Sequence, residues 1–266
     1  MRRALTSILA VLLVACQAGS PAAEARPRTT IPAFHPDTDA RDPSPPVPGT
    51  ATSVASPAAT TSGARAAGET LVAHAEGPIE IFEFPHYSAG RMVLEEETIL
   101  GTPRVLRVLE GPWDGWIKVA LPLRPNGSSG WALADRFKLE IVDQAISVDL
   151  VARSLSLTVA GAVVLTTEVA IGSLSNPTPT GSYFVTDIIE LADPSGPWGP
   201  YALGLSAFSD TITEFNGGDG IIGIHGTNRP DKIGQAVSLG CVRVPNGTIT
   251  RLASLVDLGV PAEITG

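Results

Sequence analysis

Short stretches in which apolar and polar positions alternate fill residues 70–141. The segment IEIFEF alternates, TPRVLRVLEG has the pattern of a strand and a turn, and GWIKVALP precedes RPNGSSGWALADRFKLEIV, which starts with a Pro-Asn-Gly turn. This spacing is typical of short β-strands joined by tight turns. About seventy residues of such a pattern predict a small β-barrel domain over residues 70–141.

A second β-rich unit is expected over residues 142–266. Apolar positions alternate at Leu155, Leu157 and Val159, and Ala160-Gly161 then predicts a turn into a second strand. The run GIIGIHGT indicates a buried strand that ends at His225.

One helix is expected near the C-terminus, in the segment PNGTITRLASLVDLG. Asn246 can cap it, and Gly259 followed by Pro261 can end it. Its apolar residues recur at helical spacing, which predicts one buried face made of Ile249, Leu252 and Val256. The expected fold class is therefore mainly β, with a short C-terminal helix.

The first 16 residues have the pattern of an export signal. Arg2 and Arg3 precede an apolar stretch from Ala4 to Ala15 that is too short to span a bilayer. The run ends in Leu-Val-Ala-Cys, which resembles a bacterial lipobox, so we expect lipidation at Cys16. The alternative is an ordinary signal peptide that is cut nearby and discarded with Cys16.

Residues 17–69 are rich in Ala, Pro, Ser and Thr and hold few large apolar side chains. Such a segment cannot bury enough surface to offset the entropy lost on ordering, so we expect a disordered tether. As a flexible coil it would span roughly 40 Å.

The overall charge narrows the possible partners. The formal net charge is −9, and no run of basic residues could neutralise phosphates, so nucleic acid is not expected as a partner.

The chain contains two cysteines and four histidines, and Cys241 follows His225 by sixteen positions. A cysteine acts as a nucleophile when a base removes its proton, and histidine is the natural base near neutral pH. The N–H groups of Gly240 and Cys241 could form an oxyanion hole. A buried structural cysteine is an equally weighted alternative on spacing alone, whereas zinc is discounted because further Cys or His ligands are missing nearby.

The segment HGTNRPDKIGQAVSLGCVRV resembles the signature of the YkuD-type L,D-transpeptidases, in which a histidine, often followed by Gly-Thr, precedes a Ser-x-Gly-Cys-hydrophobic-Arg motif. The matching positions are His225, Gly226, Thr227, Ser238, Gly240, Cys241, Val242 and Arg243. The resemblance runs from residue 146 to the C-terminus. Residues 70–141 resemble bacterial Src-homology-3-like domains through their GW steps.

The resemblance implies a peptidoglycan L,D-transpeptidase in which Cys241 is the nucleophile and His225 the base. It also implies that the backbone carbonyl of Gly226 orients the imidazole. Many members carry a histidine before the Gly-Cys step, where this chain has Leu239, so no second histidine is assigned a role. The family further implies acylation by carbapenems and neither a metal nor an organic cofactor.

Three residues are candidates for contact with the substrate, each with a structural alternative. Arg243 can hold a stem carboxylate or brace its own loop through backbone carbonyls. The Ser238 hydroxyl can bind substrate or order the loop, and Tyr201 can line the groove or pack.

The expected partners are peptidoglycan stem peptides and, through the lipid anchor, the outer face of the cytoplasmic membrane. With water as acceptor, the same residues would make an L,D-carboxypeptidase. A non-enzymatic lipoprotein that binds the wall is the alternative from another functional class.

Overall fold

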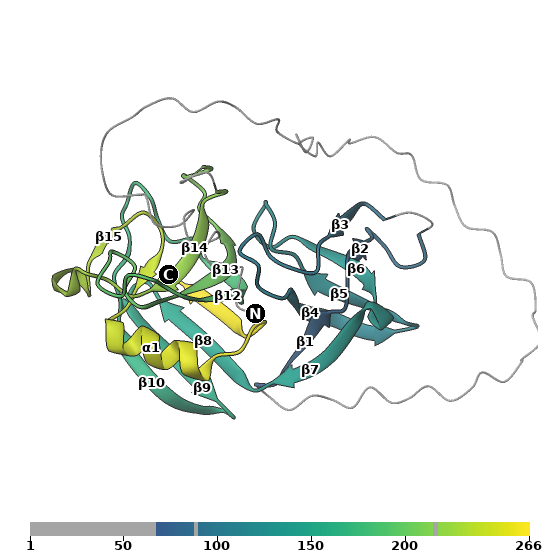
Figure 1. Ribbon diagram of the computed structural model, residues 1–266, viewed down its shortest axis with the longest axis horizontal. Coiled ribbons are helices and arrows are strands. Elements are labelled where there is room, and N and C mark those ends of the chain that lie inside the picture. The colour runs from purple at the N-terminus through teal and green to yellow at the C-terminus, as the bar shows by residue number, and fades with distance from the viewer. Residues whose placement is uncertain (1–67, 88–89, 215–217) are drawn as a thin grey trace, which may run out of the picture. The chain divides into compact units, whose positions relative to one another are not determined.

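The computed structural model describes residues 68–87, 90–214 and 218–266, which belong to one compact unit. The expected signal segment, the expected lipidation site Cys16 and most of the expected tether lie outside the described residues. Nearly all regular structure is β, so the prediction of a mainly β chain is confirmed (Figure 1). In the part that the structure describes, none of the helices is long and apolar enough to cross a membrane.

The first sheet is antiparallel and has the strand order β6-β5-β4-β1-β7. Its strands are β1 (Thr70–Ala75), β4 (Val105–Trp113), β5 (Trp116–Ala120), β6 (Ser129–Leu133) and β7 (Phe137–Val142). A separate pair, β2 (Ile79–Ile81) with β3 (Met92–Leu94), and the 3₁₀-helix η2 (Ala134–Arg136) complete this region.

Alternation along β1 and β4 buries both faces of these strands. Ala73 and Leu106 are partners across the strands and lie in the core of the first sheet. Their neighbours Val72 and Val105 point to the opposite face, because side chains alternate along a strand, and join the core of the second sheet. The first sheet is therefore packed between its own core and its neighbour.

The second sheet has eight strands in the order β10-β9-β8-β17-β12-β13-β14-β16. Its strands are β8 (Gln144–Asp149), β9 (Ser154–Val159), β10 (Ala162–Glu168), β12 (Gly181–Glu190), β13 (Tyr201–Phe208), β14 (Ile221–His225), β16 (Val242–Arg243) and β17 (Pro261–Thr265). The remaining elements are the parallel pair β11 (Ile171–Gly172) and β15 (Ala236–Ser238), and the 3₁₀-helix η3 (Pro230–Lys232).

The sequence pattern did not predict β17. This strand lies between β8, to which it is parallel, and β12, to which it is antiparallel. Its pairing partners are far away along the chain, so local periodicity carries little information about them.

The C-terminal helix α1 (Asn246–Leu255) is the only α-helix among the described residues. The prediction that Asn246 caps it is wrong: Pro245 is the N-cap, and Asn246 is already helical. The helix also ends at Leu255, four residues before Gly259, because Val256 is extended. The predicted apolar face is confirmed, since Ile249, Leu252 and Val256 are all buried.

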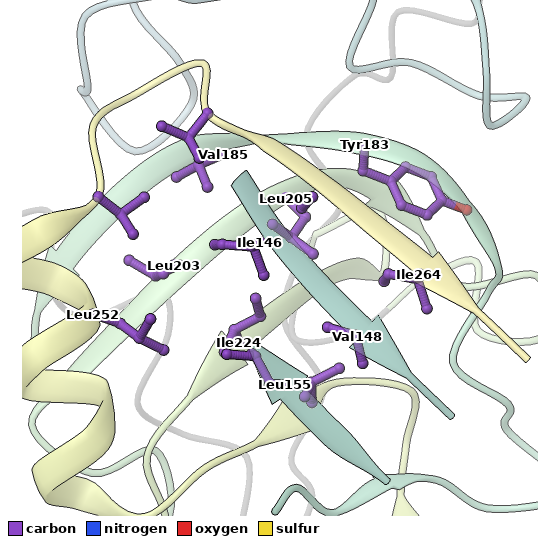
Figure 2. Close-up of a cluster of buried hydrophobic side chains, with 14 of the residues drawn as sticks. Ile146, Val148, Leu155, Tyr183, Val185, Leu203, Leu205, Ile224, Leu252 and Ile264 are labelled. Carbon is purple, nitrogen blue, oxygen red and sulfur yellow. The ribbon is translucent and has the colours of Figure 1, made fainter. Parts of the chain in front are cut away.

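Helix α1 packs on the second sheet, and Leu252 points from it toward Leu203 of β13 in the buried cluster (Figure 2). Strand side chains such as Ile146, Val148 and Leu155 complete this cluster. The helix thus closes the core over the strands that carry His225 and its neighbours.

The packing of α1 predicts a large difference between two leucine substitutions. Leu252 is 0% exposed, and Leu252→Ala should lower the free energy of unfolding by about 3 kcal/mol because it leaves a cavity in the core. Leu174 is fully exposed, so Leu174→Ala should change it by less than about 0.5 kcal/mol. Urea denaturation measures both values, and equal effects would contradict the assigned packing.

Candidate active site

The pairing of β14 with β16 places the candidate residues together. These strands are parallel, with Ile224 opposite Val242 and His225 opposite Arg243. Ile224 and Val242 lie in the core. Alternation along each strand therefore turns His225 and Arg243 to the other face, and Cys241 lies in the turn that leads into β16, two positions before Arg243.

His225 is held in one orientation by its own loop. Its side chain is buried, and Nδ1 lies 2.6 Å from the carbonyl oxygen of Gly226. A carbonyl can only accept a hydrogen bond, so Nδ1 carries the proton in the neutral ring. The lone pair is then on Nε2, which is the arrangement that a general base needs.

Burial keeps this imidazole neutral. The pKa of His225 is lowered from 6.5 to about 4, chiefly by loss of solvation; the hydrogen bond to Gly226 opposes this shift and the positive charge of Arg243 adds to it. At neutral pH the ring is therefore a free base.

Cys241 lies in the turn before β16 and is partly exposed. Burial nevertheless raises the pKa of its thiol, an effect opposed by the N–H of Gly223 and by the charge of Arg243. In the resting state the Cys241 thiol and the His225 imidazole are thus both uncharged. A neighbouring base must remove the thiol proton before attack, because the thiolate is the nucleophilic form.

Ser238 closes the turn that contains Cys241. Its buried hydroxyl donates to the carbonyl of Cys241 (2.6 Å) and accepts from the N–H of Gly240 (3.1 Å). These bonds favour the loop-ordering interpretation of Ser238 over substrate contact. They also occupy one of the two expected oxyanion donors, the N–H of Gly240.

Gly240 is required at this turn. Its φ of +120° lies in a region that L side chains rarely adopt, and an added Cβ would lie 2.8 Å from the Ile222 side chain. Its carbonyl accepts a hydrogen bond from the hydroxyl of Thr178 (2.7 Å). Thr178, which the sequence pattern did not single out, therefore fixes the residue before Cys241.

The other candidates differ in their surroundings. Nε of Arg243 is buried and has no hydrogen-bond partner in the described part of the chain, so this atom does not brace the loop. Tyr201 packs against the core of the second sheet, and its carbonyl accepts from the Gly226 N–H (3.3 Å). Leu239 is exposed beside Gly240.

Two further residues support His225, and sequence reasoning missed both. The ring of Trp198 lies over the imidazole, with centroids 4.4 Å apart and planes tilted by 32°. Asn246 uses its side-chain oxygen to accept from the N–H of Thr227 (2.7 Å) instead of capping α1. Trp198 stands between two Gly-Pro steps. A scarce aromatic residue in such a turn was the sequence signal that could have pointed to it.

The junction around Asn246 is tight. Gly199 has a φ of +66°, and a Cβ there would lie 2.4 Å from the Asn246 oxygen and 2.7 Å from Gly226 Cα. The absence of a side chain at Gly199 therefore lets the Trp198 loop approach the His225 loop.

Metal-binding side chains do not gather in the part of the chain that the structure describes: groups of three or more His, Cys, Asp or Glu residues suited to a metal ion were not found there.

The depressed pKa of His225 predicts acid sensitivity. Between pH 6.5 and 4 the unfolded chain binds a proton at this residue that the folded chain does not, so stability falls as the pH falls. The full contribution is about 3 kcal/mol. Urea denaturation should show that the free energy of unfolding of the wild type falls between pH 6.5 and 4. In His225→Gln the fall over the same range should be smaller by about 3 kcal/mol. Parallel curves for the two proteins would contradict the buried neutral state.

The stacking of Trp198 on His225 predicts that removing the indole changes the pKa of the imidazole. Trp198→Ala opens the imidazole to water, and because desolvation is the largest cause of the shift, the pKa of His225 should move from about 4 toward 6.5. An NMR titration of the histidine ring protons measures this. Trp113→Ala, at an exposed tryptophan of the first sheet, is the matched control and should leave the value unchanged.

The C-terminal part of the chain is similar in sequence to known proteins. The model of the YkuD family, described as an L,D-transpeptidase catalytic domain, matches residues 143–264. A Bacillus subtilis protein named as the L,D-transpeptidase YkuD is 37% identical over 119 residues, which are 45% of this chain and 64% of that protein. Its namesake from Bacillus licheniformis is 35% identical over 126 residues, which are 47% of this chain and 68% of that protein.

A solved L,D-transpeptidase from Mycobacterium smegmatis aligns with 71% of this chain and 99% of its own, at 14% identity and a TM-score of 0.39. That score is too low to support an inference about the fold. The sequence identities and the family match carry the assignment, and the chain belongs to the YkuD family of L,D-transpeptidase catalytic domains.

Proposed function

We propose that the protein is a peptidoglycan L,D-transpeptidase that uses Cys241 as nucleophile and His225 as general base. The observation that supports this proposal is the register of β14 and β16, which pairs His225 with Arg243, two residues after Cys241 in the turn that leads into β16. The bond from Nδ1 of His225 to Gly226 supports it, because it leaves Nε2 able to take a proton.

In the first step, Sγ of Cys241 attacks the carbonyl that links the L-centre of a diamino acid to the terminal D-Ala of a tetrapeptide stem. His225 takes the thiol proton. The tetrahedral intermediate then collapses, the same proton passes to the departing amine, and D-Ala leaves. The product is a thioester between Cys241 and the shortened stem.

In the second step, the side-chain amine of a neighbouring stem attacks the thioester carbonyl and gives a proton to His225. Collapse of the intermediate releases Cys241, which regains its proton from His225, and leaves an amide crosslink between the third residues of two stems. Water in place of the amine would make the enzyme a carboxypeptidase, so the acceptor must be positioned to compete with solvent.

The N–H of Cys241 is the oxyanion donor that we retain from the sequence prediction. The N–H of Gly240 is bound to Ser238 in the resting turn and would have to leave that hydroxyl to join it. For Arg243, the unpartnered buried Nε supports the proposed role in holding a stem carboxylate.

We also propose the surroundings in which the enzyme works. Residues 1–16 would export the chain, Cys16 would anchor it by lipid at the outer face of the cytoplasmic membrane, and residues 17–69 would act as a tether. Residues 70–141 would be a Src-homology-3-like domain, and residues 142–266 the catalytic domain. The support is the sequence patterns. Carbapenems are expected to acylate Cys241, and no cofactor is proposed.

Intact-mass spectrometry of the full chain with a tetrapeptide-stem muropeptide tests the proposal. The chain carries Cys16→Ser, so that Cys241 is its only thiol. We expect a transient adduct and a crosslinked dimer that has lost one D-Ala, and neither product with Cys241→Ala. Loss of D-Ala without dimer would indicate the carboxypeptidase. A folded protein that forms no adduct would favour the non-enzymatic, wall-binding lipoprotein.

A further inference from the structure

The loop between β5 and β6 of the first sheet reaches the segment that follows β13 in the second. The guanidinium of Arg124 donates to three backbone carbonyls of that segment: Ser209 (2.8 Å), Ile212 (3.1 Å) and Asp219 (2.7 Å). Hydrogen bonds from a charged donor are stronger than neutral ones. One side chain of the first sheet therefore ties both described ends of the β13–β14 connection together.

Asn126, two residues later, binds the end of β13 itself. Its amide nitrogen donates to the carbonyl of Phe208 (2.8 Å), and its amide oxygen accepts from the Phe208 N–H (2.9 Å). The Arg124 guanidinium also lies over the Phe208 ring, 5.1 Å from its centroid. Phe208 is the last residue of β13, so the side-chain amide of Asn126 pairs with the backbone at the end of this strand.

The segment held by Arg124 borders the turn that carries Cys241. The Ser209 side chain is buried, and its oxygen accepts from the N–H groups of Thr211 (3.3 Å) and Ile212 (3.1 Å). The same oxygen lies 4.0 Å from the position that a Cβ of Gly240 would occupy. Ser209 therefore orders the segment that Arg124 holds and lies near the residue before Cys241.

A second route reaches the same turn from the other side. The hydroxyl of Thr211 donates to the side-chain oxygen of Asn176 (3.1 Å). Two residues after Asn176, the hydroxyl of Thr178 donates to the Gly240 carbonyl (2.7 Å). This second route begins in the segment that Arg124 holds and ends in a hydrogen bond to Gly240, whereas Ser209 only approaches Gly240.

We infer that Arg124 and Asn126 are positioning residues for Cys241, through which the first sheet sets the shape of the turn around the nucleophile. Neither residue is assigned a contact with substrate. This inference deepens the proposed function, on which its kinetic part rests. It gives the first sheet a role in catalysis.

The test compares Arg124→Ala, Asn126→Ala and the control Arg136→Ala, each in the full chain with Cys16→Ser. Arg136 is an exposed arginine of η2, between β6 and β7 of the first sheet, and its ion pair is with the adjacent Asp135. The first measurement is the rate at which iodoacetamide alkylates Cys241, which does not depend on the proposed function. A loosened turn exposes the thiol, so Arg124→Ala should alkylate several-fold faster than the control.

The second measurement separates kcat from KM for D-Ala release. We expect kcat/KM to fall by about tenfold in Arg124→Ala, mostly in kcat, and by less in Asn126→Ala. Far-UV circular dichroism should match the control. If Arg124→Ala does not fold, Asn126→Ala carries the test alone, with the same expected direction in both measurements.

The outcomes are distinguishable. Alkylation and kcat/KM equal to those of Arg136→Ala, in folded protein, would overturn the inference. Faster alkylation of a protein that releases no D-Ala even as wild type would support the positioning role and count against the proposed function.

Discussion

The parallel pairing of β14 with β16 is the constraint on which the site depends. It sets Ile224 beside Val242 in the core and so turns His225 and Arg243 to the other face, with Cys241 in the turn just before β16. A slip of one residue in this register would place the histidine against the core and expose its apolar neighbour. Burial of Ile224 and Val242 therefore specifies the position of the chemical groups as strongly as it stabilises the sheet.

The same burial determines the charge state of the site. His225 and Cys241 are both pushed toward their neutral forms by loss of solvation. The positive charge of Arg243 lowers the pKa of both groups, so it keeps the His225 imidazole neutral but favours the Cys241 thiolate. The proton then has to move during the reaction itself, and the orientation of Nε2 matters more than the resting charges. Gly226, Trp198 and Asn246 all contribute to that orientation through backbone and ring contacts.

The two sheets meet through both apolar and polar groups. Val72 and Val105 enter the core of the second sheet, while Phe184 of β12 enters that of the first. Thr98 donates to the buried Asp187 (2.6 Å), and Arg107 binds Glu263 (3.2 Å). Because a buried carboxylate without a partner is costly, these contacts hold the sheets in one arrangement. The contacts of Arg124 with the β13–β14 connection belong to this interface.

The sequence alone determined the β-rich class, the apolar face of α1 and the strand that ends at His225, and it singled out a scarce histidine and a scarce cysteine as candidate catalytic residues. These follow from local periodicity and from residue chemistry, which are written along the chain. Tertiary structure decided where β17 inserts, that Asn246 binds Thr227 instead of capping its helix, and that Ser238 takes the N–H of Gly240. It also brought Trp198 over the ring of His225 and Arg124 to the β13–β14 connection. Each of these depends on partners distant in sequence, because a polar group that is buried on folding takes whichever donor or acceptor the packed chain brings to it.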